Sequence, residues 1–343
     1  MTAPAEVVRL DGLRVHLGKR DILVVEEFVA TAGEAVALLG PNGSGKSTLL
    51  RTAALLIEPA AGSVHLFGAR PRGRGERARL RRRTASVFTD PTLLDMSARG
   101  NVEVALGIHG VSGSQRRRRA ERWLERLGVA HLAGARPHTL SAGEAQRIAL
   151  ARAFAVDPEL LFLDEPFASL DFETRARLVG DLRELLAASE VTALIATHDR
   201  GEAELLADRL AVLVGGRLVQ DGPTRQVLEY PRSAEVASLL GHALLTPEQV
   251  RCLAPRVEAR GVLAHLPPGA VRLADDVEPG ASRVPLLSIR GAGGRVQLVC
   301  DLGGPATFEV GAAHIAGREL RPGAMLALAV DIERLHWLPD TTR

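Results

Sequence analysis

Hydrophobic and polar positions before residue 242 follow two periods. Residues 1–31 contain the alternating runs VVRL, LRVHL and DILVVEEFVA, which are typical of antiparallel strands. The continuous apolar runs EAVALLG, ELLFLDEP and VTALIATHD are bounded by polar turns, as expected of parallel strands buried on both faces. Helical periodicity follows in EAQRIALARAFA and ETRARLVGDLRELLAA. Because strands and helices alternate, the pattern predicts an α/β fold.

The pattern changes at His242. From there to the end of the chain, proline and glycine are frequent, helical periodicity fades, and short alternating runs such as VQLVC, ATFEV and MLALAV follow one another. A chain of 343 residues is long enough for two hydrophobic cores. We therefore expect an α/β domain over residues 1–241 and a small β-rich domain over residues 242–343.

Composition places the chain among globular proteins. Of its residues, 46% are apolar and 24% are charged, and the formal net charge is only +2, which argues against a disordered chain or a general nucleic-acid binder. Cys252 and Cys300 lack the spacing of a metal site and predict buried, unreactive thiols in a reducing compartment. No apolar run reaches the roughly 18 residues of a membrane span, and the amino terminus lacks the features of a secretion signal. We therefore expect a soluble chain that is not exported.

Lysine is nearly absent, and one of its two positions marks a candidate site. Of the 43 basic residues only Lys19 and Lys46 are lysines, which a coding bias toward arginine explains. Lys46 lies in GPNGSGKST, which fits the phosphate-binding pattern G-x-x-x-x-G-K-[ST] and stands between a predicted strand and a predicted helix. The residues of this loop that we expect to hold nucleotide phosphates are Gly40, Pro41, Asn42, Gly43, Ser44, Gly45, Lys46, Ser47 and Thr48.

The chemistry of a phosphate-binding loop requires these residue types. Glycines let backbone N–H groups turn toward phosphate oxygens, and the helix amino terminus adds the positive end of its dipole. Lys46 is expected to place a compact ammonium between the β- and γ-phosphates of ATP, where the larger arginine fork does not fit. The Ser47 hydroxyl is expected to bind Mg²⁺. The predicted cofactors are therefore ATP and Mg²⁺.

Two later strand ends supply candidate catalytic groups. The run LLFLDEP ends in adjacent carboxylates, of which Asp164 is predicted to hold Mg²⁺ and Glu165 to polarise the attacking water. The run ALIATHD ends in His198, whose imidazole is expected to contact the γ-phosphate. With Lys46, these residues form the predicted catalytic set.

A further motif carries a family resemblance. The segment LSAGEAQRIALARA resembles the signature sequence of ATP-binding cassette (ABC) ATPases, usually written LSGGQ. SLD, which ends at Asp171, is similar to the D-loop of that family, and His198 stands where its switch histidine is found. The motifs follow one another in the order and spacing of the family. The resemblance implies a P-loop NTPase with a RecA-like core, an antiparallel β subdomain and a helical subdomain.

The resemblance also implies a dimer of ATPase subunits, either two identical or two different chains. Two such domains close head to tail, so that each ATP is held by the P-loop of one subunit and the signature of the other. Ser141 and Gly143 would then face the γ-phosphate from the start of a helix, with Glu144 and Asp171 beside them. Ser141 and Glu144 also have the spacing of a helix capping box, and both roles are compatible.

Two positions depart from the family pattern. In SVFTDPTLLDMS, Thr89 stands where the family has a glutamine that reaches Mg²⁺ and the attacking water, so weaker hydrolysis or altered coupling is expected. Leu17 stands where the family places an aromatic residue under the adenine. Leu17 offers only an apolar contact, and the neighbouring His16 is an alternative stacking group.

Arginine forms two clusters in the predicted cassette. These are Arg70, Arg72, Arg74, Arg77, Arg79, Arg81, Arg82 and Arg83, and Arg116 to Arg119. Such clusters are usually solvated surfaces; the alternative is that the first cluster faces acidic lipid or a membrane partner. No nucleic-acid binding is expected, because few aromatic residues accompany the arginines.

Residues 242–343 resemble the OB/TOBE-like accessory domain of ABC import ATPases, particularly in LRPGAMLALAVDIERLHWLP. We therefore expect an importer ATPase at the cytoplasmic face of the cell membrane, where transmembrane permease subunits and a solute-binding protein are its partners and its own membrane contact is indirect. The cassette looks most like those of tungstate or molybdate importers, with sugar or polyamine as other solutes. A soluble regulatory, ribosome- or DNA-associated ABC ATPase and an exporter ATPase are the alternatives.

Overall fold

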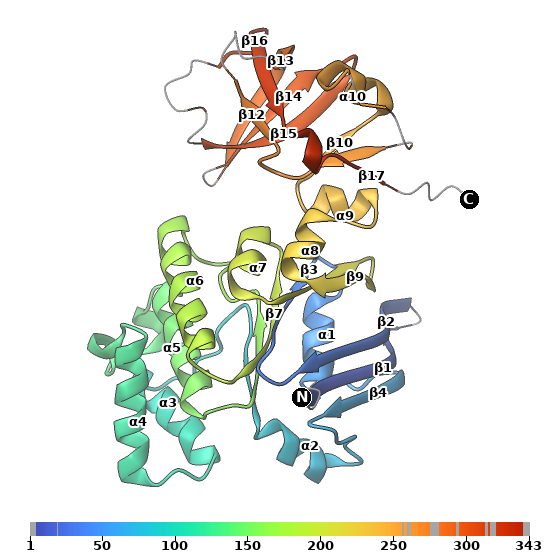
Figure 1. The fold of residues 1–343 in the computed structure, drawn as a ribbon. Coiled ribbons are helices and arrows are strands. Elements are labelled where there is room, and N and C mark those ends of the chain that lie inside the picture. Colours follow the sequence, from blue (N-terminus) through green and yellow to red (C-terminus); the bar gives the residue numbers. More distant parts are fainter. Residues whose placement is uncertain are drawn as a thin grey trace. The chain divides into compact units, whose positions relative to one another are not determined.

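The computed structural model describes residues 5–18, 20–255, 257–258, 261, 263–274, 281–292, 295–312, 315 and 320–338. Two compact units, residues 1–224 and 225–343, make up the chain (Figure 1). The boundary predicted from the sequence lies further on, after the helices α8 (Thr224–Glu229) and α9 (Ala234–Leu239), and stays a prediction. No helix in the described ranges is long and apolar enough to cross a membrane.

The first unit is built on a nine-stranded sheet, counted over its described residues, in the order β4-β1-β2-β9-β8-β3-β7-β6-β5. Its strands are β1 (Glu6–Leu17), β2 (Arg20–Thr31), β3 (Ala35–Leu39), β4 (Ala61–Leu66), β5 (Thr84–Val87), β6 (Leu160–Asp164), β7 (Thr192–Thr197), β8 (Arg209–Val214) and β9 (Arg217–Pro223). Strands β3, β5, β6, β7 and β8 run parallel, whereas β1 pairs antiparallel with β2 and β4. The antiparallel start and the parallel strands that the sequence predicts are both confirmed.

Helices of the first unit fall into a core set and a separate helical part. They are α1 (Lys46–Ala53), α2 (Arg74–Arg81), α3 (Ala98–Ile108), α4 (Gly113–Arg126), α5 (Ala142–Ala155), α6 (Phe172–Ala187) and α7 (Arg200–Leu206), with 3₁₀ turns at Ala130–Leu132 and Pro137–Thr139. Helices α3, α4 and α5 contact one another and form the helical part (Figure 1). The unit therefore has the predicted α/β core with antiparallel β and helical subdomains.

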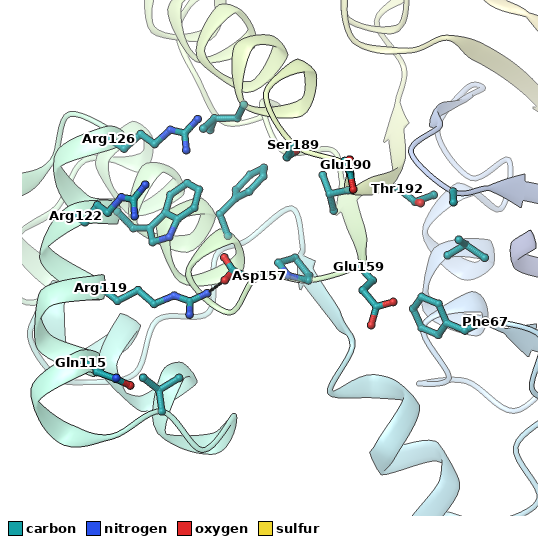
Figure 2. A pocket seen from close by; sticks show the side chains of 18 of the residues that line it. Phe67, Gln115, Arg119, Arg122, Arg126, Asp157, Glu159, Ser189, Glu190 and Thr192 are labelled. Carbon is teal, nitrogen blue, oxygen red and sulfur yellow. Dashed lines mark ion pairs between the residues drawn. The ribbon is translucent and has the colours of Figure 1, made fainter. Parts of the chain in front are cut away.

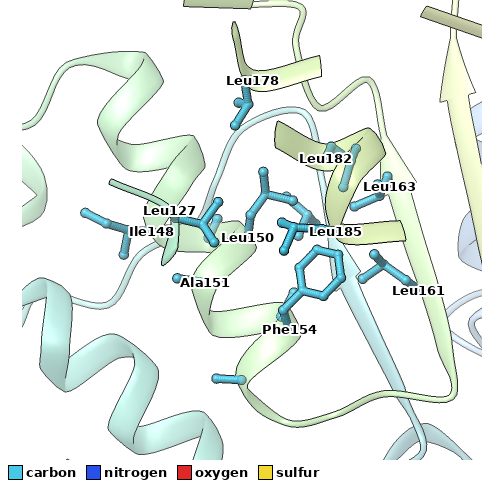
Figure 3. Close-up of a cluster of buried hydrophobic side chains, with 14 of the residues drawn as sticks. Leu127, Ile148, Leu150, Ala151, Phe154, Leu161, Leu163, Leu178, Leu182 and Leu185 are labelled. Carbon is cyan, nitrogen blue, oxygen red and sulfur yellow. The ribbon is translucent and has the colours of Figure 1, made fainter. Parts of the chain in front are cut away.

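Alternate residues of the buried strands pack into different cores. In β6, Leu161 and Leu163 enter the core beneath the helical part, whereas Leu160 and Phe162 enter the core shared with α1 and the antiparallel strands. Figure 3 shows the first of these cores, which includes Leu127, Ile148, Leu150, Ala151, Phe154, Leu161, Leu163, Leu178, Leu182 and Leu185. Each fully buried leucine contributes about 2 kcal/mol of transfer free energy. Strand ends fixed by packing on both faces are a rigid base for a site.

The second unit is mainly antiparallel sheet. Its elements are α8 (Thr224–Glu229), α9 (Ala234–Leu239), β10 (Ala243–Leu245), α10 (Pro247–Leu253), β11 (Ala264–Leu266), β12 (Val271–Leu273), β13 (Ser282–Ala292), β14 (Arg295–Asp301), β15 (Pro305–Gly311), β16 (Met325–Val330), a 3₁₀ turn (Ile332–Arg334) and β17 (His336–Trp337). One sheet has the order β12-β16-β13-β14-β15, and its outer strands β12 and β15 contact each other, so the sheet curls. A curled antiparallel sheet confirms the predicted OB/TOBE-like fold class.

The two cysteines differ in exposure. Cys300 is fully buried in the core of the second unit, and burial raises the pKa of its thiol to about 11, as expected of an unreactive thiol. Cys252 is exposed on α10, so the prediction that both thiols are buried is wrong for this residue. It lies near the end of a short amphipathic helix, where burial of Val250 and Leu253 turns it toward solvent.

Candidate functional site

The predicted phosphate-binding loop joins β3 to α1, and its glycines meet specific steric demands. A Cβ atom at Gly40 would lie 2.3 Å from the backbone oxygen of Leu213, which excludes any side chain there. Gly45 adopts a φ of +100° immediately before α1, a backbone conformation that L side chains rarely adopt. The turn after β8 braces the loop, because the N–H of Gly216 donates to the oxygen of Ser44 at 3.1 Å. The spacing of glycines in the motif is thus required by the backbone.

Lys46 opens α1 and points back into the loop. Its ammonium is buried and donates to the backbone oxygens of Gly40 at 2.8 Å and Pro41 at 3.2 Å. It also lies 3.3 Å from Oε1 of Glu165. A buried cation is tolerated only when it is paired in this way, and these partners keep Lys46 in place next to the strand ends.

Asp164 ends β6 beside the first turn of α1. Its Oδ1 accepts a hydrogen bond of 2.7 Å from the Ser47 hydroxyl, whereas its buried Oδ2 has no hydrogen-bond partner among the described residues. Burial raises the pKa of Asp164, and the Ser47 hydrogen bond and the guanidinium of Arg51, 3.9 Å from Oδ2, oppose that rise. A hydroxyl oxygen next to a carboxylate that keeps one oxygen without a hydrogen bond fits Mg²⁺, which takes one or two protein oxygens beside phosphate oxygens.

Glu165 follows Asp164 in a strained conformation. Its φ is +48°, which is uncommon for a residue with a long side chain, and its N–H donates to the oxygen of Ala196 at 2.9 Å. The carboxylate lies between the Lys46 ammonium, which is 3.3 Å from Oε1, and the His198 imidazole, whose Nδ1 is 3.3 Å from Oε2. The three predicted catalytic residues therefore meet at the carboxyl ends of β6 and β7.

Thr89 contacts this centre through its hydroxyl. The Oγ1 atom donates to the backbone oxygen of Asp164 at 3.1 Å. Its predicted part in the Mg²⁺ site stays a prediction, as does the weaker hydrolysis expected for threonine at this position. The contact does place residue 89 against the strand end that carries both acidic side chains.

Asn101 and Arg152 connect the segment after Thr89 to the helical part by hydrogen bonds. The sequence pattern does not single out either residue. The amide of Asn101, fully buried in α3, accepts from the N–H of Leu94 at 2.7 Å and donates to the Leu94 oxygen at 3.0 Å. Arg152 of α5 donates to the oxygen of Thr92 at 2.8 Å. The sequence signal for Asn101 is a polar side chain at helical spacing from the apolar residues Ala98 and Ala105, and no signal distinguishes Arg152 from the other arginines.

The signature and the D-loop line one shallow hollow of about 270 Å³. Ser141 begins α5 with a complete capping box: its N–H and hydroxyl each donate to Oε2 of Glu144 at 2.8 Å, and its oxygen accepts from the Glu144 N–H. Hydrogen bonds from Ser141 lower the pKa of Glu144. The predicted capping box is confirmed.

The other two predicted residues of this hollow are Gly143 and Asp171. A Cβ atom at Gly143 would lie 2.8 Å from Cγ2 of Thr174, so the start of α5 packs closely on α6. Asp171 caps α6 by accepting from the Thr174 N–H at 3.0 Å, and this hydrogen bond lowers the pKa of Asp171. The structure brings the two motifs together at one surface, and their contact with ATP in a head-to-tail dimer stays a prediction.

The hairpin between β1 and β2 carries the predicted adenine contacts. Nε2 of His16 lies 2.6 Å from Oδ1 of Asp21, whereas Leu17 is 73% exposed. The hairpin adjoins the phosphate-binding loop, since the backbone oxygen of Ile22 lies 3.4 Å from the position of a Cβ atom on Gly45. An exposed apolar side chain at the tip of this hairpin is compatible with the predicted base contact. Lys19 lies outside the described residues.

Members of the first arginine cluster make paired contacts. Arg77 binds both carboxylate oxygens of Glu58, at 2.7 and 3.3 Å. Arg83 binds those of Glu159 at 2.6 and 2.5 Å and covers the ring of Phe67. Hydrogen bonds from these arginines lower the pKa of both glutamates. These two arginines thus have local partners, and a lipid or permease contact of the cluster stays a prediction.

Comparison with known proteins supports the motifs. The family model described as "ABC transporter" matches residues 27–168. The molybdate/tungstate import ATP-binding protein WtpC of Thermococcus kodakarensis is 40% identical over 247 residues, which are 70% of this chain and 71% of that protein. The Fe(3+) ions import ATP-binding protein FbpC of Streptomyces coelicolor is 37% identical over 294 residues, which are 85% and 80%.

A solved structure has the same cassette fold. It is the dimeric structure of a post-hydrolysis state of the ATP-binding cassette MJ0796 bound to ADP and Pi, with a TM-score of 0.58 and 29% identity, covering 64% of this chain and 99% of that one. Motifs, geometry and relatives agree. The chain belongs to the ABC transporter family, as an ATP-binding subunit that hydrolyses ATP.

Proposed function

We propose that this chain powers an ABC importer, hydrolysing ATP as one of two ATPase subunits bound to separate permease subunits, with a solute-binding protein as a further partner. The observation that carries the proposal is the meeting of Lys46, Ser47, Asp164, Glu165 and His198 at one edge of the sheet. The import direction follows from relatives of 37–40% identity that are named import ATP-binding proteins. The place of action is then the cytoplasmic face of the membrane.

Nucleotide binding would begin with an exchange of partners at Lys46. Its ammonium donates to two backbone oxygens of the loop and pairs with Glu165. The more highly charged β- and γ-phosphates would take the place of these partners. Backbone N–H groups of the glycine-rich loop and the amino terminus of α1 would bind the remaining phosphate oxygens. The exchange frees Oε1 of Glu165 at the moment when ATP is in place.

Hydrolysis would then use the freed carboxylate. Glu165 accepts a proton from a water molecule as the water oxygen attacks the γ-phosphorus, and the bond from that phosphorus to the bridging oxygen of ADP breaks. His198, half exposed beside Oε2 of Glu165, is placed to donate a hydrogen bond to the γ-phosphate.

Ser47 and Asp164 would hold Mg²⁺. When bound, the ion neutralises part of the phosphate charge and polarises the γ-phosphoryl group. The Oδ2 atom of Asp164 is the observation that supports this site. It is buried, has no hydrogen-bond partner among the described residues and lies 3.9 Å from the Arg51 guanidinium, so its burial costs free energy that a directly bound cation would offset. Asp164 and Ser47 are already joined, so few side chains need to move.

Exposed apolar residues beside the Thr89 segment support a permease contact. Leu94 is 44% exposed, and Val104 and Ile108, one turn apart on α3, are 37% and 66% exposed. The same segment is joined to Asp164 by Thr89 and to the helical part by Asn101. A permease loop on this surface would therefore respond to changes at the ATP site. The hollow at Ser141 and Asp171 is the surface that a second ATPase subunit would place over the ATP.

The solute is proposed to be an oxyanion, molybdate or tungstate, because of the 40% identity to a molybdate/tungstate import protein. Deletion of the gene and complementation with the wild type or Lys46→Ala would test this in cells that depend on the importer. We expect uptake of labelled molybdate to need the wild-type chain. Loss of iron uptake with unchanged molybdate uptake would reassign the solute, and unchanged uptake of every solute would refute the importer.

A further inference from the structure

A groove on the cassette lies away from the residues assigned to ATP. It has a volume of about 910 Å³ and borders the amino-terminal ends of β6 and β7, whereas the ATP residues lie at the carboxyl ends of these strands. One wall is α4, and the other is formed by the segments before β6 and β7 (Figure 2). The volume is near the upper end of the range found for ligand sites, about 300–1,000 Å³. None of the groups proposed for hydrolysis lines it.

The α4 wall is a row of guanidinium groups. Figure 2 shows Arg119, Arg122 and Arg126 extending from α4 into the groove, and Arg118 lines it as well. Arg119 forms an ion pair with Asp157. Arg118, Arg122 and Arg126 are exposed and have no ion-pair partner among the described residues. Three cations without carboxylates on one concave wall are a site for negative charge.

The spacing of these three cations excludes a single small anion as their common ligand. They occur at every fourth position, so their helical positions are about 6 Å apart and span about 12 Å along α4. Carboxylates at every fourth position of a helix repeat at about the same 6 Å, and those at alternate positions of a strand repeat at about 7 Å. A polypeptide with regularly placed acidic residues therefore matches the row.

The other surfaces of the groove favour a protein segment over a nucleic acid. The floor contains Trp123 stacked on Phe154, with ring centroids 5.4 Å apart, and the guanidinium of Arg126 lies 5.0 Å from the Trp123 ring. Trp123 is the aromatic residue that α4 contributes to the groove, whereas single-stranded nucleic acid binds to a series of rings on which successive bases stack. Glu190, on the opposite wall (Figure 2), would repel a chain that is anionic along its whole length. A peptide can place acidic residues against α4 and apolar residues on the floor.

We propose that this groove binds an acidic amphipathic segment of a protein partner, with its carboxylates paired to Arg118, Arg122 and Arg126. Bidentate pairing of guanidinium and carboxylate supplies the orientation, and the apolar floor supplies burial. The proposal is independent of the importer assignment, because it rests on residues that take no part in ATP binding.

Fluorescence anisotropy with the full-length chain tests the proposal. The probe is a fluorescein-labelled helical peptide with glutamate at every fourth position and leucine or alanine between. We expect saturable binding that weakens at least about tenfold in the double variant Arg118→Ala, Arg122→Ala. The matched control removes the same charge outside the groove with Arg117→Ala, Arg183→Ala, and we expect its affinity to stay within about twofold of wild type. Unchanged circular dichroism and ATPase activity exclude misfolding in either variant.

A second readout locates the bound peptide. Trp123 and Trp337 are the two tryptophans of the chain, so Trp337→Phe leaves Trp123 as a reporter in the floor of the groove. We expect its emission to change on peptide binding. Equal weakening in both double variants, or binding that leaves Trp123 emission unchanged, would overturn the proposal. Equal or tighter binding of tripolyphosphate, single-stranded DNA or phosphatidylglycerol vesicles through the same arginines would overturn it in favour of that class.

Discussion

The loop that contains Lys46 and the hollow that contains Ser141 differ in how their polar groups are satisfied. At the first, a buried ammonium and two carboxylates lie close together, one carboxylate oxygen has no hydrogen-bond partner among the described residues, and Glu165 has a strained backbone. At the second, Glu144 is half-buried, Asp171 is exposed, and each completes a helix cap. Buried polar groups that lack partners cost free energy in the protein without ligand, and a ligand that pairs with them offsets this cost. The first region is therefore suited to binding and chemistry.

In the second region, Glu144 and Asp171 are already part of helix caps, so its helix ends are stable without a ligand. In the proposed head-to-tail dimer, the other subunit would bring a phosphate to the hydroxyl and N–H groups of this hollow. Comparing equivalent substitutions in the two regions separates residues that perform chemistry from residues that shape a surface.

The largest difference in ATP turnover is expected between substitutions of two glutamates, Glu165 and Glu144. Glu165→Gln should lower ATP turnover by about 10²–10⁴-fold, because glutamine cannot accept the proton of the attacking water. Glu144→Gln should leave turnover within a few-fold of wild type, since glutamine also completes a capping box. Phosphate release under saturating ATP measures both. Equal losses in the two variants would contradict the assignment of the base.

The Glu165→Gln protein should also keep its affinity for ATP. Lys46 and the loop are untouched by this change, and the ammonium loses an anionic competitor. We expect the variant to elute as an ATP-bound dimer in size-exclusion chromatography, with Lys46→Ala as the control that binds no nucleotide. A monomer at saturating ATP would argue against head-to-tail closure.

The next difference is between two aspartates whose pKa values shift in opposite directions. Burial raises the pKa of Asp164, so the ionised form destabilises the fold at neutral pH, whereas a hydrogen bond from Thr174 lowers the pKa of Asp171, so its ionised form stabilises. Asp164→Asn should therefore abolish hydrolysis and raise Tm by a few degrees. Asp171→Asn should lower Tm slightly and keep much of the activity.

The pH dependence of these Tm changes follows from the same shifts. Ionised Asp164 lowers the free energy of unfolding; this effect is absent below the ordinary aspartate pKa of about 4 and develops as pH rises through the raised pKa. Ionised Asp171 raises the free energy of unfolding; this effect is present above about pH 4 and is lost as pH falls through the lowered pKa. The Asp164→Asn difference from wild type should therefore shrink as pH falls from 7 toward 4, whereas the Asp171→Asn difference should stay constant over that range and shrink only below about pH 4. A destabilised Asp164→Asn protein at pH 7 would refute the burial argument.

A smaller effect is expected at the start of α5. Ser141→Ala removes the hydroxyl that accepts from the Glu144 N–H, which should cost about 1 kcal/mol and lower the Tm of the cassette by about 2–4 °C. Ser141→Asn, which retains a cap, is the matched control. If Ser141 also meets ATP, turnover in the alanine variant should fall more than in the asparagine variant when both are compared well below Tm.

The sequence singles out residues of both regions. Lys46, Asp164 and Glu165 are predicted because a glycine loop and adjacent acids after buried strands imply one chemistry, and the structure places the three side chains together, while their roles stay predictions. The Ser141 cap followed from its spacing to Glu144. In both regions the signal is local in sequence, and the packing of continuous apolar runs on two faces brings the pieces together.

What the sequence could not predict depends on contacts between distant segments. Asn101 is buried by packing around α3, and its bonds to the Leu94 backbone have no sequence signature beyond a polar residue among apolar ones. Arg152 is one arginine among many until the Thr92 oxygen is placed beside it. The exposure of Cys252 depends on which face of the short helix α10 packs against the core of the second unit, and the composition of the helix does not determine that face.

The smallest effect is expected at Thr89, where the sequence departs from its family. Threonine donates to the backbone oxygen of Asp164, a bond worth about 1 kcal/mol, and does not contact the Asp164 or Glu165 carboxylates among the described contacts. Thr89→Gln loses that bond but gains a side chain long enough to approach the attacking water. We expect turnover to rise by up to about threefold or to stay unchanged, with Thr89→Val, which removes only the hydroxyl, as the control. A clear loss in the glutamine variant with retained activity in the valine variant would show that a short side chain is required here, and a loss in both would show that the hydroxyl is required.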